Sequence, residues 1–192
     1  MKNKCIMIVG VGGQGSLLAS HVLGNTALAL GYDVKVSEVH GMSQRGGSVV
    51  TYVKYGEKVH SPVICEGEAD VILAFEQLEA ARWTEFLKIG GEMYVNTQQI
   101  SPMPVITGAA EYPSDIMNKI KASGINAVSC DALAMAKEAG SAKAVNIVLI
   151  GLYAKNSGVD KQVYLDAIKA SVPAKILDIN IKAFELGYSY AG

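Results

Sequence analysis

The chain has 192 residues and a formal net charge of −1; half of its residues are hydrophobic and 18% are charged. A chain this hydrophobic with so little charge is not intrinsically disordered. Soluble domains carry about 25% charged residues, so the shortage of charge here indicates either a sheet buried on both faces or a surface covered by a partner. The near-neutral charge argues against nucleic acid or an anionic membrane as a partner. The length suits a single α/β domain over residues 1–192.

The three cysteines, Cys5, Cys65 and Cys130, lie far apart in the sequence. Their spacing matches no iron–sulfur or zinc motif, so we expect free thiols, no metal ligands and a reducing, cytoplasmic environment. No apolar run approaches the length that spans a bilayer. The short apolar run near the first residue ends in glycines, which favours a buried strand over a signal peptide.

The first half of the chain predicts a strand, a glycine turn, a helix and a second strand, the order of a right-handed βαβ unit. The uninterrupted apolar run at residues 5–9 is typical of a central parallel strand covered on both faces. The expected elements are a strand at 5–9, a helix at 17–30, strands at 33–39 and 48–54, and a hairpin turn at 55–58 that leads into 59–60.

The second half predicts strands alternating with helices and then helices alone. The expected elements are a strand at 70–75, a helix at 76–88, a short strand at 93–95, an extended proline-containing stretch at 97–113, a helix at 114–123 with Ser114 as its N-cap, a strand at 127–130, a helix at 131–140 capped by Asp131, and helices at 144–154, 161–170 and 174–187. The fold class is therefore α/β, Rossmann-like, with a mostly parallel sheet, helices on both faces and a helical C-terminal end.

The glycine turn after the first strand is the first candidate site. Gly10, Gly12 and Gly15 match G-x-G-x-x-G between a strand and a helix, where backbone can approach a ligand and the helix N-terminus can bind an anion. In dinucleotide-binding proteins an acidic residue closes the second strand, and Glu38 stands near that place. Alternatively, the glycines only allow tight packing. The candidate binding residues are Gly10, Gly12, Gly13, Gln14, Gly15 and Ser16.

The glycine-rich stretch after the second strand is the second candidate site, because ligands bind at the carboxyl edge of open parallel sheets. Arg45 could clamp a phosphate or a carboxylate. His40 with Glu38 could form an acid–base pair, or His40 could be structural. An interface loop making only structural hydrogen bonds is the alternative for the whole stretch. Its candidate residues are Glu38, His40, Ser43, Gln44 and Arg45.

These motifs resemble those of one family. GVGGQG at 10–15, SEVHGMSQRGGSV at 37–49 and SPV at 61–63 are similar to the beta subunits of indolepyruvate:ferredoxin oxidoreductases, a form of the gamma domain of the 2-oxoacid:ferredoxin oxidoreductases. Gly140-Ser141-Ala142 departs from the family pattern. Further matches run along the chain: GEADVILAFEQLEAAR at 67–82, YVNT at 94–97, YP at 112–113, VNIVLIG at 145–151, and Asn180, Phe184, Gly187 and Tyr188 near the end.

The resemblance implies a subunit of an enzyme that converts an arylpyruvate, coenzyme A and oxidised ferredoxin to an acyl-CoA, carbon dioxide and reduced ferredoxin. It implies that thiamine diphosphate, Mg²⁺ and the iron–sulfur clusters reside in a large alpha subunit, that ferredoxin is reached through the complex, and that the isolated chain is inactive. The glycine turn and Arg45 are the candidates for contact with a phosphate-bearing ligand. Two alternatives remain open: a stand-alone dinucleotide-binding oxidoreductase domain and a purely structural subunit.

Overall fold

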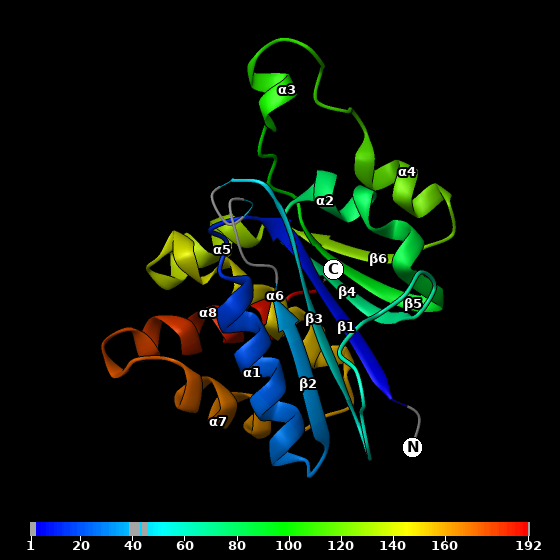
Figure 1. The fold of residues 1–192 in the computed structure, drawn as a ribbon. Helices are drawn as coiled ribbons and strands as arrows, with labels where there is room; N and C mark the ends of the chain where they lie inside the picture. Colours follow the sequence, from blue (N-terminus) through cyan, green and yellow to red (C-terminus); the bar gives the residue numbers. More distant parts are fainter. Residues whose placement is uncertain (1–2, 39–42, 44–45, 192) are drawn as a thin grey trace.

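A computed structural model describes residues 3–38, 43 and 46–191, which contain one six-stranded sheet (Figure 1). The strand order is β2-β3-β1-β4-β5-β6. The bounds of the strands are β1 Lys4–Val11, β2 Asp33–Glu38, β3 Ser48–Gly56, β4 Ala69–Ala74, β5 Leu87–Asn96 and β6 Asn126–Cys130.

Four neighbouring strands, β1, β4, β5 and β6, run parallel to one another, and β3 pairs antiparallel with both β1 and β2. Strand β2 therefore runs in the same direction as β1, but β3 lies between them. The apolar run at the start of the chain forms a central strand, as predicted, because helices cover it on both faces. The predicted α/β fold with a mostly parallel sheet is confirmed.

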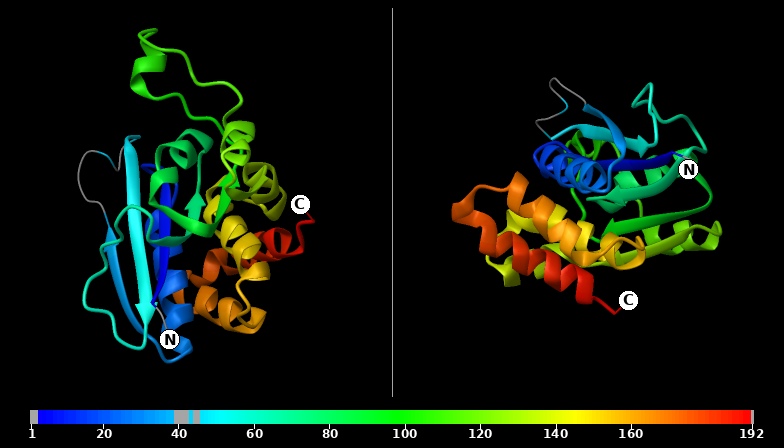
Figure 2. Two further views of the ribbon diagram at one scale, coloured as in Figure 1. Left: turned by 90° about the vertical axis from the view of Figure 1, so that its right-hand side faces the viewer. Right: turned by 90° about the horizontal axis from the view of Figure 1, so that it is seen from below.

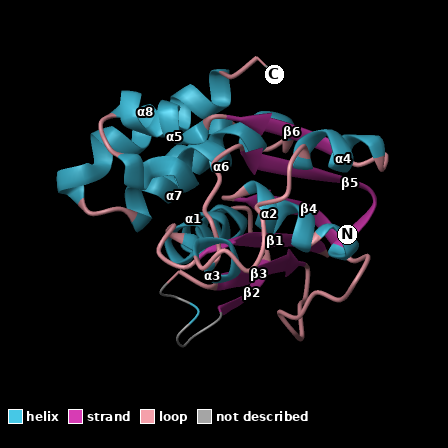
Figure 3. Cartoon of the chain, turned by 90° about the horizontal axis from the view of Figure 1, so that it is seen from above, coloured by secondary structure: helices cyan, strands magenta, loops and turns pink. Residues whose placement is uncertain are grey.

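Helices pack against both faces of this sheet (Figure 2, Figure 3). Alternate residues of β1 point to opposite faces: Ile6 and Ile8 pack toward α1 and the C-terminal helices, and Met7 and Val9 pack toward α2 and α4. The helical elements are α1 Ser16–Ala29, α2 Gln77–Arg82, η2 Thr84–Phe86, α3 Met103–Ile106, α4 Ile116–Ala122, α5 Ala132–Ala139, η3 Ala142–Ala144, α6 Val145–Asn156, α7 Lys161–Ser171, η4 Ala174–Ile176 and α8 Leu177–Ser189.

The C-terminal helices confirm the predicted helical end, and two of them, α6 and α8, cross at unusually short range. A Cβ on Gly151 would lie 2.2 Å from the Phe184 carbonyl oxygen, and a Cβ on Gly187 would lie 2.0 Å from that of Val148. Only glycine allows two helix backbones to touch in this way. Ten consecutive residues of α6 are buried, so this helix forms the centre of the larger core.

Three local predictions were wrong. Residues 59–60 form no strand; instead Val59 N–H donates to Asp33, and the hairpin partner of β3 is β2. The helix expected at 76–88 ends at Arg82, because Leu87 already begins β5 and Gly90, with a positive φ, lies inside that strand near a register irregularity. The N-cap of α4 is Asp115 in a left-handed conformation, not Ser114.

The stretch between β5 and α4 projects away from the rest of the domain, and we call residues 97–113 the arm (Figure 1, Figure 2). It is extended, as predicted, except for the single helical turn α3 at its outer end. Across the part of the chain that the structure describes, no helix combines the length and apolar character needed to cross a bilayer.

Candidate functional site

The glycine turn joins β1 to α1 at the carboxyl edge of the sheet, as the sequence predicts. Gly13 and Gly15 have φ values of +99° and +84°, in the left-handed region that favours glycine. Gly10 is required for a different reason: a Cβ there would lie 2.8 Å from Gln14 Oε1 and 3.1 Å from Phe75 Cβ. The turn thus combines backbone freedom at Gly13 and Gly15 with close packing of Gly10 on Phe75, the residue after β4.

Both ends of the Gln14 amide bond within the chain. Val11 N–H donates to Gln14 Oε1 over 2.7 Å, and Gln14 Nε2 donates to the Phe75 carbonyl oxygen over 3.0 Å. The same carbonyl accepts a hydrogen bond from Asn96 Nδ2 at 3.0 Å, while Asn96 Oδ1 accepts the Ala132 N–H at 3.1 Å. This belt of side-chain amides ties together the carboxyl ends of β1, β4 and β5 and the first turn of α5.

Asn146 connects the glycine turn to α6. It is 1% exposed, its Nδ2 donates to the Gly15 carbonyl oxygen at 2.9 Å, and its Oδ1 accepts the Ile147 N–H at 2.9 Å. A Cβ on Gly15 would lie 2.7 Å from that amide nitrogen. Asn146 is a polar residue in an otherwise apolar helix, and the glycine turn supplies the hydrogen-bond partner that its burial requires.

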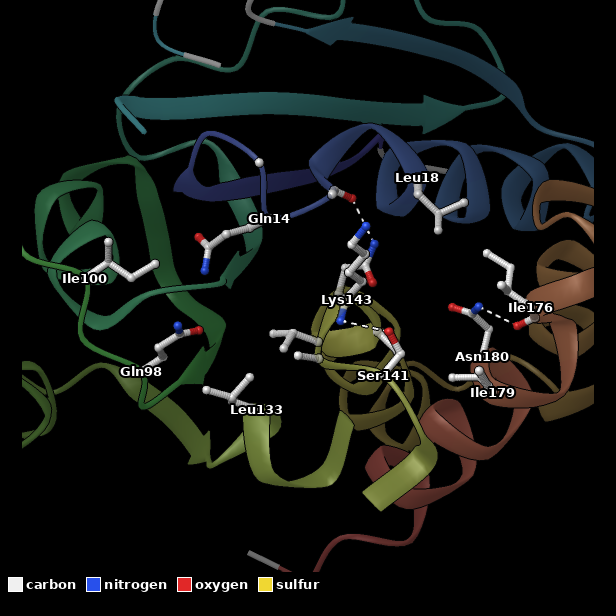
Figure 4. Close-up of a pocket in the computed structure, with 16 residues that line it drawn as sticks. Gln14, Leu18, Gln98, Ile100, Leu133, Ser141, Lys143, Ile176, Ile179 and Asn180 are labelled. Carbon is white, nitrogen blue, oxygen red and sulfur yellow. Dashed lines mark hydrogen bonds between the residues drawn. The ribbon is translucent and has the colours of Figure 1, made fainter. Parts of the chain in front are cut away.

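A cavity of about 510 Å³ opens beside the turn (Figure 4). The N-terminal ends of α1 and α6 both reach it, and helix N-termini carry partial positive charge. Its size is that of small-molecule sites. Polar and apolar side chains are interspersed around it (Figure 4): the polar ones are Gln14, Gln98, Ser141, Lys143, Asn146 and Asn180, and the apolar ones are Leu18, Ile100, Leu133, Val145, Ile176 and Ile179.

The candidates on the turn differ in their relation to this cavity. Gly13, Gln14 and Gly15 line it, whereas Gly10, Gly12 and Ser16 do not. The residues that sequence reasoning missed, Gln98, Ser141 and Lys143 among them, come from segments far apart in the chain. Only the glycine turn gave a local signal, because the other walls assemble through the fold.

The second candidate stretch touches the first. Gly12 N–H donates to the Gly47 carbonyl oxygen at 2.9 Å, so the glycine turn and the end of residues 38–47 are neighbours. The Ser43 carbonyl accepts the Gly47 N–H at 3.0 Å. His40, Gln44 and Arg45 lie outside the described residues. Gly47, at the end of this stretch, therefore lies beside the glycine turn.

Glu38 is not placed to bind a nucleotide ribose at the glycine turn. Its Oε1 accepts a hydrogen bond from Ser20 Oγ of α1 at 2.8 Å, and it does not line the cavity. Since β3 separates β2 from β1, the end of β2 lies two strand spacings, about 10 Å, from the end of β1. In a dinucleotide-binding domain these two strands are adjacent. This topology disfavours the dinucleotide alternative.

Two buried carboxylates at the start of α2, which the sequence did not single out, organise the rim of the site. Glu76 accepts hydrogen bonds from Tyr112 Oη and from Ile100 N–H, and burial together with this carboxylate raises the pKa of Tyr112. Glu79 accepts from Ser48 Oγ, at the start of β3, and from Trp83 Nε1. One carboxylate thus anchors the base of the arm and the other anchors the strand after residues 38–47.

Comparison with known proteins agrees with the motifs. The family model for pyruvate ferredoxin/flavodoxin oxidoreductases matches residues 5–190. The indolepyruvate oxidoreductase subunit IorB of Thermococcus kodakarensis is 46% identical over all of this chain and 97% of its own length. These matches span essentially the whole chain.

Two further similarities involve longer chains. The ketoisovalerate oxidoreductase subunit VorA of Methanothermobacter marburgensis is 29% identical over 97% of this chain but only 36% of its own length. The solved 2-oxoglutarate:ferredoxin oxidoreductase from Magnetococcus marinus, with 2-oxoglutarate, coenzyme A and succinyl-CoA bound, has a TM-score of 0.73 and 18% identity over 98% of this chain and 31% of that chain. The same fold therefore occurs as one part of larger polypeptides.

Proposed function

We propose, for a chain that belongs to the pyruvate ferredoxin/flavodoxin oxidoreductase family, that it is the small subunit of an indolepyruvate-type 2-oxoacid:ferredoxin oxidoreductase. Residues 1–192 form one gamma-type domain of that complex. The complex converts an arylpyruvate and coenzyme A to an acyl-CoA and carbon dioxide and passes electrons to ferredoxin. The observation that carries this proposal is the full-length similarity to an indolepyruvate oxidoreductase subunit, at 46% identity.

The redox and thiamine chemistry belongs to a larger partner subunit. An iron–sulfur cluster needs several thiolates converging on one core. Here Cys5 and Cys130 are buried in the separate clusters on the two faces of the sheet, and Cys65 is exposed; all three are free thiols. We therefore place the clusters in the partner, together with the thiamine diphosphate and Mg²⁺ that the family resemblance implies there. The complex works in the cytoplasm, where free cysteines persist.

The cavity beside the glycine turn is the contribution of this chain to the coenzyme A site. A phosphate-bearing ligand with an apolar arm suits a cavity lined by two helix N-termini, Lys143 and several isoleucine and leucine side chains. Gly13 leaves open space beside its backbone, so an anion can approach the turn closely there. The chain binds and orients coenzyme A and excludes water, while thiamine diphosphate in the partner supplies the decarboxylation chemistry.

Reconstitution tests this function. The large subunit expressed with this chain should reduce ferredoxin with indolepyruvate in a reaction that requires coenzyme A, and each subunit alone should not. Lys143→Glu should raise the KM for coenzyme A about tenfold and leave the KM for indolepyruvate unchanged, because charge reversal acts on the phosphates. Lys137→Glu, a matched reversal of an exposed lysine outside the cavity lining, should change neither constant.

Three results would contradict the proposal. Activity of this chain alone would contradict the division of labour between the subunits. A large subunit whose activity does not depend on this chain would remove its role. Tight binding of NAD(P) to the isolated chain, with none of coenzyme A to the complex, would favour the dinucleotide alternative instead.

A further inference from the structure

The arm presents apolar side chains to solvent. Glu111 is the only charged residue between positions 97 and 113, although 18% of the whole chain is charged. Met103 and Ile106, on the helical turn α3, are each 66% exposed. Solvent-facing segments of a soluble protein are normally polar, and exposed apolar groups that gather in one projecting element mark an interaction site.

The arm is held in a defined shape rather than left loose. The N–H groups of Val105 and Ile106 donate to the Pro102 carbonyl oxygen, and those of Ala109 and Ala110 donate to the Pro104 carbonyl oxygen, at 2.8–3.0 Å. These hydrogen bonds, all within the tip of the arm, hold it in a compact turn. An interaction element that is already ordered loses less conformational entropy when it binds.

The base of the arm is fastened by a single carboxylate. Oε1 of Glu76 accepts hydrogen bonds from Ile100 N–H, at 3.1 Å, and from Tyr112 Oη, so it joins the two ends of the arm. Oε2 of the same residue accepts the Glu79 N–H at 2.9 Å and caps α2. Glu76 is 1% exposed, so the fold places a buried charge where it fixes the direction in which the arm projects.

The position of the arm indicates what covers it. Gln98 and Ile100, in its first residues, line the cavity beside the glycine turn, so the arm rises from the wall of the proposed coenzyme A site. Whatever completes an active site at this cavity must face the same rim. In the relatives VorA and the 2-oxoglutarate enzyme, a unit of this length or fold makes up only 36% and 31% of a longer chain. In these two relatives the unit is therefore covalently joined to a larger polypeptide.

We propose that the arm is a docking element whose outer turn, with Met103 and Ile106, inserts into an apolar, uncharged groove on the large thiamine-containing subunit. This inference rests on the proposed function. Its apolar tip contributes affinity, and the Glu76 fastening at its base sets the orientation of the large subunit over the cavity.

The test compares exposed apolar residues at the tip of the arm with one near the start of β5. In the reconstituted complex, the double variant Met103→Ser/Ile106→Ser should raise the Kd for the large subunit at least about tenfold. Ile89→Ser is the matched control, because Ile89 is fully exposed but lies near the first residue of β5, at the opposite edge of the sheet. It should leave the Kd unchanged. All the altered side chains are exposed, so the unfolding midpoint of each variant should match that of the parent chain.

The outcomes separate the two proposals. If the parent chain forms no complex with the large subunit, the proposed function fails and the docking inference fails with it. If the parent chain assembles and the arm variant assembles equally well, the function stands and the docking inference is wrong. If the arm variant abolishes self-association of the isolated chain but not assembly with the large subunit, the arm binds a second copy, which also overturns the inference.

Discussion

The crossing of α6 and α8 and the rim at the carboxyl ends of β1, β4 and β5 are built in opposite ways. At the crossing, Gly151 and Gly187 let two backbones touch, and an aromatic series from Tyr153 through Tyr164 to Phe184 fills the surrounding core. At the rim, the glycines of the turn also leave their backbone open to close contact, but they lie beside a cavity and near an arm whose apolar side chains are exposed. The first region is complete within the chain, whereas we propose that the large subunit completes the second.

This contrast shows that glycine alone does not distinguish a binding turn from a packing contact. In the sequence, the glycine turn attracts attention because it follows a strand and precedes a helix, whereas the glycines of α6 and α8 stand out only within stretches that match the family. In the structure, the glycines of the crossing face carbonyl oxygens of the partner helix, whereas Gly13 of the turn faces open space. The atoms that a Cβ on each glycine would meet therefore distinguish a packing contact from a turn that a ligand can approach.

The largest expected effect is at the crossing. Gly151→Ala would place a Cβ 2.2 Å from the Phe184 carbonyl oxygen and 2.9 Å from the Tyr188 nitrogen, so the helices must separate. We expect the free energy of unfolding to fall by about 3 kcal/mol, measured by urea denaturation. Gly24→Ala in α1 is the control: its Cβ would meet Val34 and Val36 at ordinary distances, 3.8 and 3.9 Å, so it should stabilise by about 0.5–1 kcal/mol. Equal effects of the two changes would contradict the account.

The second effect separates two glycines of the turn. Gly13 and Gly15 both have positive φ, so either alanine variant carries a backbone strain of about 1–2 kcal/mol. Gly15→Ala also collides with the Asn146 amide at 2.7 Å, whereas Gly13→Ala meets no atom within 4 Å. Thermal unfolding should therefore show a larger loss for Gly15→Ala. A larger loss for Gly13→Ala would mean that Asn146 does not hold the turn.

The sequence predicted the elements that have strong local patterns. The apolar run of β1, the glycine turn and the Asp131 cap, which accepts the Ala134 N–H, all appear as expected. Patterns that depend on distant partners were misread. The stretch after β3 resembled a hairpin, but β3 instead inserts between β2 and β1, a choice made by pairing across the sheet.

The candidate site was predicted in part for the same reason. The glycine turn is local and readable, but the opposite wall of the cavity comes from η3, α6 and α8, more than 100 residues later in the chain. The fastening of the arm joins Glu76 to Ile100 and Tyr112, and nothing in the local sequence of Glu76 distinguishes it from a solvated helix-capping residue.

A smaller effect tests the fastening of the arm at the rim. Tyr112→Phe removes only the hydroxyl that donates to Glu76 and should lower the free energy of unfolding by about 1.5 kcal/mol, because the acceptor is a charged carboxylate. Tyr190→Phe provides the comparison: its hydroxyl donates to the neutral Ser129 carbonyl oxygen at 3.2 Å, so the loss should be about 0.5–1 kcal/mol. If Tyr190→Phe is the more destabilising, Glu76 does not fasten the arm.

The last prediction concerns the reactivity of the three cysteines and involves no substitution. Cys65 is exposed, while burial raises the pKa of Cys5 and raises that of Cys130 to about 12. At pH 8 the two buried groups carry almost no thiolate. A thiol reagent followed by mass spectrometry should therefore label Cys65 alone in the native chain and all three after unfolding. Rapid labelling of Cys130 in the native chain would show that the core opens at the end of β6.

Hydrogen–deuterium exchange of this chain, alone and in the complex with the large subunit, tests the central claim most directly. If the rim is completed by the partner, assembly should slow exchange in the arm and in the glycine turn at residues 12–18. Exchange on the outer face of α7, remote from the rim, should not change. Protection confined to α7 and α8, with the arm exchanging as fast as in the free chain, would contradict the account.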